Sequence, residues 1–221
     1  MNPDWELFLT SLGPIIGGAI AGTIPLALIS FAIGLILALG LALMRLSTIT
    51  WVSMIARGYI SVVRGTPLLV QLFVIFYGLP SIGVVIDPWP SAVLAFSINV
   101  GGYGAEIIRA AILSVPRGQW EAAYMVGMSH RRALGRIILP QAARVSVPPL
   151  SNTFISLVKD TSLASLILVT ELFREAQQIA AFSQEFMLLY LEAALVYWVI
   201  CLVLASGQGA LEKRLDRYVA H

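Results

Sequence analysis

The sequence predicts an all-α membrane protein, a bundle of five transmembrane helices. Of its 221 residues, 58% are hydrophobic and only 12% are charged, whereas soluble domains carry roughly 25% charged residues. The mean hydropathy is +0.87, and five apolar stretches reach the length of about 20 residues that a helix needs to cross a bilayer. This composition excludes a disordered chain. A single cysteine, Cys201, excludes a disulfide scaffold, and two histidines cannot form a histidine metal cluster.

The five apolar stretches follow one another with short connections. The first is about 30 residues long and can cross the membrane at a tilt. The second becomes cleanly apolar only after Pro67, and Pro- and Gly-rich turns separate it from the third. No linker or internal repeat indicates a second domain, so residues 1–221 are expected to form one transmembrane domain. The predicted spans are residues 15–44, 52–79, 91–115, 145–169 and 186–206.

Positive charge is concentrated on one side of this predicted bundle. Cytoplasmic loops of membrane proteins carry an excess of Lys and Arg, and here the other side holds only Arg174 among the basic residues, together with six of the 12 acidic residues. The N-terminus is therefore expected in the periplasm and the C-terminus in the cytoplasm. Twelve of the 14 basic residues lie on the cytoplasmic side: Arg45, Arg57, Arg64, Arg109, Arg117, Arg131, Arg132, Arg136, Arg144, Lys213, Arg214 and Arg217.

The longest polar interval is the predicted cytoplasmic loop, residues 116–140. Pro116 ends the preceding helix, residues 119–126 are good helix formers, and Gly127 permits a turn. Residues 131–138 predict a second short helix that ends at Leu139 and Pro140. A short helix outside the membrane can dock into a groove of another protein or lie on lipid, and composition leaves both open.

In this loop Glu121, Ala122 and Ala123 are followed after three residues by Gly127, after nine more by Ile137, and after one more by Leu139 and Pro140. This spacing resembles the EAA loop of ABC-importer permeases. In that family the loop forms the coupling helix, which sits in a cleft of the ATPase subunit and transmits its closure. The resemblance implies that Glu121 contacts the ATPase, that two alanines permit close approach, and that Gly127 makes the turn. The coupling residues implied are Glu121, Ala122, Ala123, Gly127, Ile137, Leu139 and Pro140.

Other segments resemble the polar amino acid branch of these permeases, and cystine permeases most. They are RGTPLLVQ at residues 64–71, PPLSN at 148–152, SLVKDTSLA at 156–164 and ELFR at 171–174. The resemblance implies a type I importer permease in a bacterial inner membrane, a transport subunit rather than an enzyme. Its expected partners are an ABC ATPase dimer, a second permease chain (a homodimer before a heterodimer) and a periplasmic amino-acid-binding protein. That protein is expected to dock at Asp87 and residues 171–185.

The chain carries no phosphate-binding loop of its own. A Gly-Lys pair, which such a loop requires, does not occur in the sequence. ATP and Mg²⁺ are therefore expected in the partner ATPase, and no cofactor, catalytic residue or metal site is expected in this chain. The arginines near residue 131 are more consistent with lipid headgroups or the ATPase than with nucleic acid.

Polar residues at membrane depth mark a candidate pathway for polar amino acids. An ionisable group there costs about 2.5–3.5 kcal/mol on insertion scales, so it usually faces protein or water. Lys159 and Asp160 point about 100° apart on a helix. They predict a helix break beside a cavity, or a structural pair satisfied by other spans. The candidate pathway residues are Gln71, Asn99, Lys159, Asp160, Thr161, Ser162 and Glu192.

Two of the acidic residues have a simpler structural interpretation. Glu192 is expected to hydrogen-bond a group on the second or third span more than to contact substrate. Glu106 and Arg109, three residues apart, are expected to form an ion pair. Two other functions stay open for the whole chain, a gradient-driven secondary transporter or channel and a membrane scaffold without transport activity.

Overall fold

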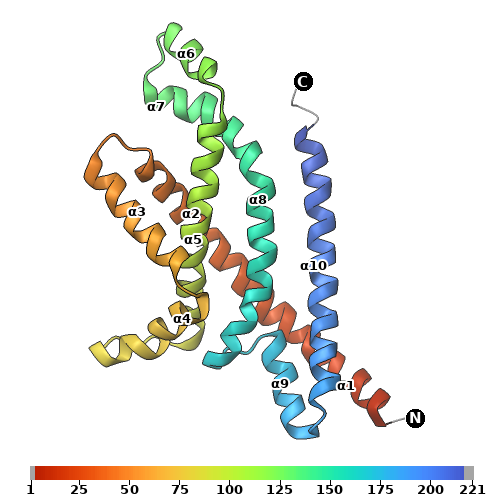
Figure 1. Cartoon of the computed structure of the whole chain (residues 1–221). Helices are drawn as coiled ribbons and strands as arrows, with labels where there is room; N and C mark the ends of the chain where they lie inside the picture. The colour runs from red at the N-terminus through yellow and green to blue at the C-terminus, as the bar shows by residue number, and fades with distance from the viewer. Residues whose placement is uncertain (1–2, 217–221) are drawn as a thin grey trace.

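The structure, a computed structural model, describes residues 3–216, and these residues are almost entirely helical. α1 (Pro3–Gly18) and α2 (Ile24–Arg45) form one long rod through the π-helical turn Ala19–Thr23. This rod runs diagonally across α5 (Pro88–Ser114), α8 (Leu139–Asp160) and α10 (Phe186–Asp216), as Figure 1 shows. The predicted cytoplasmic residue Arg217 lies outside the described residues.

Three of the described helices are long and apolar enough to cross a membrane, or up to five if each of two bent helix pairs is one span. The three are Trp5–Arg45, Pro88–Ser114 and Phe186–Arg214. They correspond to the first, third and fifth predicted spans, and the first and last extend well beyond the predicted bounds. Hydropathy detects only the apolar part of a helix, whereas backbone hydrogen bonding continues until a residue or turn stops it.

The predicted second span falls on a strongly bent pair. α3 (Thr50–Gly65) is followed by α4 (Leu68–Phe73), which continues through further helical turns to Ile82, and the two parts meet at 106°. Proline lacks an N–H and disfavours the helical conformation of the residue before it. Thr66, which precedes Pro67, is accordingly extended, with φ −121° and ψ 143°.

The predicted fourth span falls on the second bent pair. α8 passes into the 3₁₀ turn Thr161–Ile167, and α9 (Leu172–Ser183) follows at an angle of 48°. Whether each bent pair crosses the membrane as one unit decides between three and five crossings. The five-span count therefore stays a prediction.

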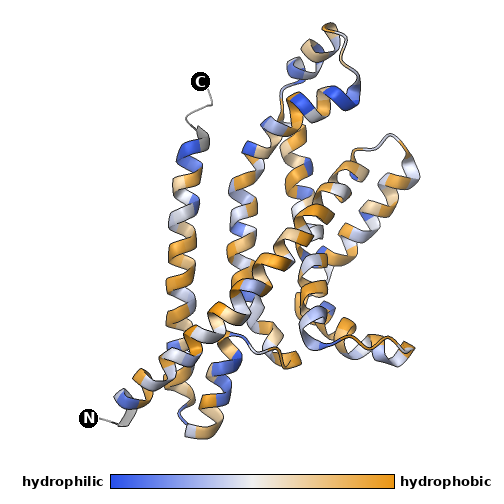
Figure 2. Cartoon of the chain, turned by 180° about the vertical axis from the view of Figure 1, so that it is seen from behind, coloured by the Kyte–Doolittle hydropathy of each residue, from blue (hydrophilic) through white to orange (hydrophobic). Residues whose placement is uncertain are grey.

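The two ends of the bundle differ in character. α6 (Arg117–Met125) and α7 (His130–Ala133) lie at the end where α10 also finishes, and α1 begins at the opposite end (Figure 1). Figure 2 shows hydrophobic residues along the long helices and hydrophilic residues gathered at α7 and around α9. This arrangement agrees with an odd number of crossings, while the orientation in the membrane stays a prediction.

A buried carboxylate connects the first rod to α9 and α10. Glu171 is fully buried and caps the start of α9. It accepts hydrogen bonds from the backbone N–H groups of Phe173 at 3.0 Å and Arg174 at 2.8 Å. The hydroxyl groups of Tyr197, at 2.8 Å, and Thr23, at 3.3 Å, also donate to it. One side chain therefore holds three segments in register.

This burial corrects one expectation for the segment 171–185. Glu171 cannot contact a docking protein, because its carboxylate is enclosed and already accepts hydrogen bonds inside the bundle. Other side chains of this segment are exposed, among them Phe182 at 93%. The exposed residues of this segment lie beyond the first turn of α9: Gln178, Ala181, Phe182, Gln184 and Glu185.

The rod approaches α9 closely at a glycine. A Cβ atom on Gly22 would lie 2.5 Å from the carbonyl oxygen of Thr170 and 2.7 Å from the Cα of Glu171. Both neighbours are backbone atoms, so they cannot rotate away. Only glycine allows the rod to lie this close to the Glu171 cap.

We expect Gly22→Ala to destabilise the protein, because the added methyl group must push the backbone of α9 away from the rod. Overpacking of this kind costs about 1–3 kcal/mol, which corresponds to a fall in Tm of several degrees, measurable by thermal unfolding in detergent. Gly17→Ala is the matched control, since a Cβ there meets nothing within 4 Å. Equal Tm values for the two variants would contradict the close contact.

Candidate translocation site

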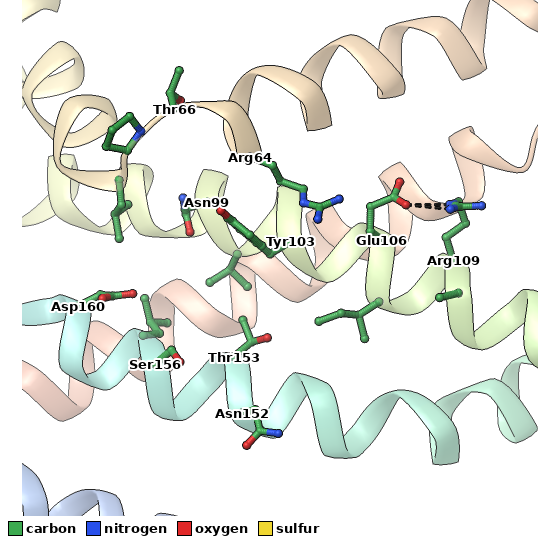
Figure 3. Close-up of a pocket in the computed structure, with 16 residues that line it drawn as sticks. Arg64, Thr66, Asn99, Tyr103, Glu106, Arg109, Asn152, Thr153, Ser156 and Asp160 are labelled. Atoms are coloured by element: carbon green, nitrogen blue, oxygen red, sulfur yellow. Dashed lines mark hydrogen bonds and ion pairs between the residues drawn. The ribbon is translucent and has the colours of Figure 1, made fainter.

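A cavity of about 780 Å³ lies between α5, α8 and the junction of α3 with α4 (Figure 3). Its walls are partly apolar, but side chains of both charges and several amides and hydroxyls line it. The polar and charged lining residues are Arg64, Thr66, Asn99, Tyr103, Glu106, Arg109, Asn152, Thr153, Ser156 and Asp160. A cavity with this lining is suited to a small polar molecule that carries both charges.

The break between α3 and α4, which forms one wall, is held by Gln71. In a continuous helix the N–H of Pro67 would bond to the carbonyl of Val63, but proline has none. The Gln71 Nε2 donates to that carbonyl instead, at 2.8 Å, and to the carbonyl of Thr66 at 3.1 Å. Its Oε1 accepts from Asn99 Nδ2 at 3.2 Å. Gln71 therefore repairs the break and also orients Asn99, which lines the cavity.

Lys159 and Asp160 face different hollows. Asp160 lines the 780 Å³ cavity, whereas Lys159 and Ser162 line a separate groove of about 590 Å³ against the aromatic side chains of α10, among them Tyr197 and Trp198. The α-helix ends at Asp160 and continues as a 3₁₀ turn. The sequence left two alternatives here, a helix break beside a cavity or a structural pair satisfied by other spans; the helix changes type at this position but continues to Ile167.

Thr161 and Glu192 are buried away from the cavity. The Thr161 hydroxyl donates to the carbonyl of Val158 at 2.7 Å. Glu192 accepts from Ser11 Oγ at 2.6 Å. The expectation of a partner for Glu192 on the second or third span was wrong, because the first rod begins at Pro3, earlier than predicted, and its first part packs against α10. The other oxygen, Oε1, has no hydrogen-bond partner among the described residues.

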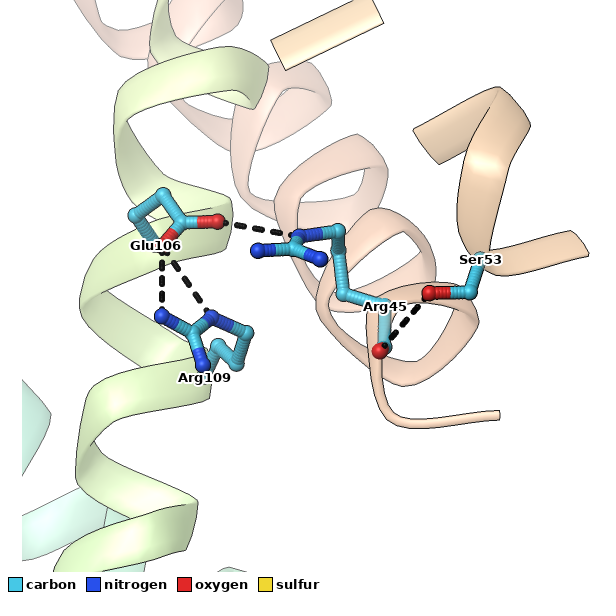
Figure 4. Close-up of polar contacts among 4 residues, drawn as sticks. All are labelled: Arg45, Ser53, Glu106 and Arg109. Atoms are coloured by element: carbon cyan, nitrogen blue, oxygen red, sulfur yellow. Dashed lines mark hydrogen bonds and ion pairs between the residues drawn. The ribbon is translucent and has the colours of Figure 1, made fainter. Parts of the chain in front are cut away.

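A charge network borders the cavity at the end nearer α6 (Figure 4). Glu106 accepts from Arg109 Nε at 3.0 Å and Nη2 at 2.9 Å, and from Arg45 Nε at 3.2 Å. The predicted pair of Glu106 and Arg109 is therefore confirmed. Arg45 joins it from the end of α2, and the hydroxyl of Ser53, on α3, donates to the carbonyl of Arg45 at 3.2 Å. One carboxylate thus connects α2 and α5 beside the start of α3.

Several cavity residues were missed by the sequence reasoning, which looked for polar groups near the middle of each span. Arg64 lies over the ring of Tyr103, with its Cζ 5.5 Å from the ring centroid. Arg64, Asn152 and Ser156 fall inside the segments that resemble polar amino acid permeases. Those segments were therefore an available signal, whereas nothing in the sequence singled out Thr153.

The loop between α5 and α8 turns where the sequence predicted. Gly127 has φ +77°, a left-handed conformation that side chains with a Cβ rarely adopt. The N–H of Gly127 bonds to the carbonyl of Tyr124 at 2.9 Å, and that of Met128 to the carbonyl of Ala123 at 3.0 Å. This pair of bonds is a Schellman motif, which ends α6.

The second arm of the loop differs from its prediction. The helix that begins at His130 does not end at Leu139 and Pro140 but continues without interruption to Ile167. A π-helical turn, Leu134–Ile138, precedes the proline. Proline is tolerated at the start of α8 because the local change in hydrogen bonding accommodates its missing N–H.

The residues of the EAA-like pattern divide into an outer and an inner set. Glu121 and Ala122 are exposed on α6, and the adjacent Met125 is 88% exposed. Ala123 is buried. Ile137 and Leu139 pack with Trp120 against a buried cluster formed by the ends of α5 and α8. Pro140 is exposed at the start of α8. One set therefore presents a surface, and the other attaches the loop to the bundle.

These features define a class of protein, a multi-pass membrane permease with a polar cavity and a helical loop at one end. The family model described as "Binding-protein-dependent transport system inner membrane component" matches residues 30–217. The chain belongs to this family, and it is a permease subunit of an ABC amino-acid importer.

Similarity to individual proteins is extensive. The chain is 58% identical to the L-cystine transport system permease protein TcyB of Bacillus subtilis, over 98% of this chain and 93% of that protein. It is 39% identical to the probable amino-acid ABC transporter permease protein YckA of the same organism, over 98% of each. A crystal structure of an amino acid ABC transporter with histidines matches with a TM-score of 0.90 and 36% identity, over 97% of this chain and 100% of that one.

We expect Glu106→Gln to lower the stability of the protein by about 1–3 kcal/mol, because two guanidinium groups lose a charged hydrogen-bond acceptor. Arg109→Gln should cost less, since Arg45 still pairs with Glu106. Thermal unfolding in detergent measures both variants. Arg57→Gln, an exposed change on α3, is the control. A Tm of Glu106→Gln equal to that of Arg57→Gln would contradict a stabilising network.

Proposed function

We propose that this chain carries polar amino acids, with cystine the leading candidate, across a bacterial inner membrane. The observation that carries the proposal is the 58% identity, over nearly the whole chain, to a permease named for L-cystine transport. The chemistry of the cavity supports it. Asp160 offers a carboxylate to an amino group, Arg64 offers a guanidinium to a carboxylate, and amides and hydroxyls lie between them.

In this proposal the whole chain, residues 1–221, is one transmembrane domain with five crossings, and each bent pair crosses as one unit. The N-terminus lies in the periplasm, and α6 and α7 lie in the cytoplasm. The concentration of basic residues at the α6 end supports this orientation. Because the cavity is not fully enclosed by this chain, a second permease chain completes the pathway. A homodimer is the first choice and a heterodimer the second.

ATP and Mg²⁺ bind to a partner ATPase dimer, and this chain performs no catalysis itself. The outer face of α6, with Glu121 and Ala122, docks into the ATPase. Ala123, Gly127, Ile137, Leu139 and Pro140 shape that helix and attach it to the bundle. A periplasmic amino-acid-binding protein delivers the substrate near Asp87 and the exposed part of α9. Transport follows alternating access, because ATP and the loaded binding protein favour different conformations.

The decisive experiment is uptake of radiolabelled cystine into proteoliposomes that contain the permease, its ATPase and its binding protein. ATP-dependent uptake that survives collapse of proton and sodium gradients supports the proposal. Uptake that needs no ATPase and disappears with those gradients would favour a secondary transporter or channel. The absence of uptake under either condition would favour a scaffold without transport activity.

Asp160→Asn should lower cystine uptake strongly while the complex still assembles, because the substituted side chain loses the charge that faces the cavity. Asn99, the amide that Gln71 orients, is expected to contribute less. Lys159→Met tests the other hollow. Uptake by Lys159→Met at the wild-type rate would show that the groove lined by Lys159 and Ser162 is not part of the substrate pathway. Uptake by Asp160→Asn at the wild-type rate would contradict the assignment of the 780 Å³ cavity as the substrate pathway.

Gly127→Val should uncouple ATP hydrolysis from uptake, because a β-branched residue resists the left-handed conformation that ends α6. Glu121→Arg should do the same by reversing the charge on the docking face. The readout is cystine transported per ATP hydrolysed. Gly118→Ala, on the same helix with open space around its Cβ, is the control. An unchanged ratio in Gly127→Val and Glu121→Arg would contradict the coupling role of α6.

A further inference from the structure

The geometry points to His130 as a positioning residue for coupling, a clasp that fastens α6 to the long helix beginning at α7. This inference rests on the proposed function, since it assumes that motion of α6 drives the permease. The clasp consists of His130, Trp120 and Tyr124. It acts by making α6 and the helix His130–Ile167 move together.

The backbone alone does not hold α6 in place. On one side, Val115 and Pro116 are extended, with ψ of 126° and 138°, so α6 is not a continuation of α5. On the other side, the turn at Gly127 interrupts the helical hydrogen bonding. Both connections of this nine-residue helix are therefore non-helical, and side-chain contacts set its orientation.

Three side chains make the contact between α6 and α7. The ring of Trp120 stacks on His130, with centroids 5.0 Å apart and planes at 14°. The Tyr124 hydroxyl hydrogen-bonds His130 Nδ1 at 2.9 Å. His130 thus contacts one residue in the middle of α6 and one in its last turn. A third link, from Gln141 Nε2 to Gln119 Oε1 at 3.2 Å, joins the start of α6 to α8.

His130 stands at the start of a helix that reaches the cavity. That helix runs from His130 to Ile167, with a π-helical turn at its start and a 3₁₀ turn after Asp160, and Asp160 lines the cavity near its far end. Thirty residues of helix span about 45 Å at 1.5 Å per residue. A displacement of α6 that the clasp passes to His130 therefore moves a rod whose other end lines the cavity. Without the clasp, the last turn of α6 loses its side-chain link to this helix.

The apolar contacts of the loop do not replace the clasp. Trp120 also packs against the buried cluster at the ends of α5 and α8, and this attaches the first half of α6 to the bundle. In the second half Ala123 is buried, whereas Tyr124 and Met125 are exposed, Met125 by 88%. The Tyr124 side chain is linked to α7 through its hydrogen bond to His130.

The test measures cystine transported per ATP hydrolysed by the complete complex in proteoliposomes. His130→Ala removes both contacts and should lower this ratio about threefold or more. Tyr124→Phe removes only the hydrogen bond, and His130→Phe keeps a ring for stacking, so both should lower the ratio less. Ser129→Ala is the matched control, because Ser129 is exposed and its side chain makes no capping bond; its ratio should equal that of the wild type.

Amide hydrogen exchange in the same complexes provides the second readout. His130→Ala should speed exchange in residues 117–125 and leave residues 145–160 protected. Exchange that rises equally in both segments would make His130 merely structural and overturn the clasp, as would a wild-type transport ratio in His130→Ala. A wild-type complex without ATP-dependent uptake would overturn the proposed function and the clasp with it. If the wild type couples uptake to ATP hydrolysis and His130→Ala transports the same amount of cystine per ATP, the clasp is overturned and the proposed function is not.

Discussion

Backbone groups that lose their partners where a helix breaks must find new ones inside the protein, and the rest of this structure depends on that constraint. In an apolar environment each unsatisfied group costs several kcal/mol. Gln71 supplies the donor that Pro67 lacks, and Glu171 accepts from the first free N–H groups of α9. These two polar side chains permit sharp bends between helices in a chain that is 58% hydrophobic.

The same repairs position the candidate site. Gln71 uses its remaining oxygen to hold Asn99 at the cavity wall. Lys159 and Asp160, the last two residues of α8, point in different directions on the helix, so the Asp160 carboxylate lines the cavity and Lys159 faces a different groove. Most of the polar lining comes from the facing sides of α5 and α8, and the break between α3 and α4 adds Arg64 and Thr66 to it.

The loop at the α6 end lies outside the apolar bundle, so different interactions hold it in place. An inner set of side chains, which includes Ile137 and Leu139, attaches the loop by packing. Aromatic and polar contacts at His130 then set how the short helix sits on the long one. Packing is non-directional and the stacked, hydrogen-bonded contact is directional, so the two together hold α6 in one orientation. Its exposed face stays available to a partner.

The sequence by itself determined the features that depend on local pattern. These include the membrane class, the apolar stretches, the polar loop, the turn at Gly127 and the pairing of Glu106 with Arg109 one turn away. Tertiary structure decided the rest: the partner of Glu192 is Ser11, Arg45 completes the Glu106 network, and Glu171 is buried rather than exposed. Contacts between residues 61 to 181 positions apart depend on where each helix ends and how it tilts, and no local pattern encodes either.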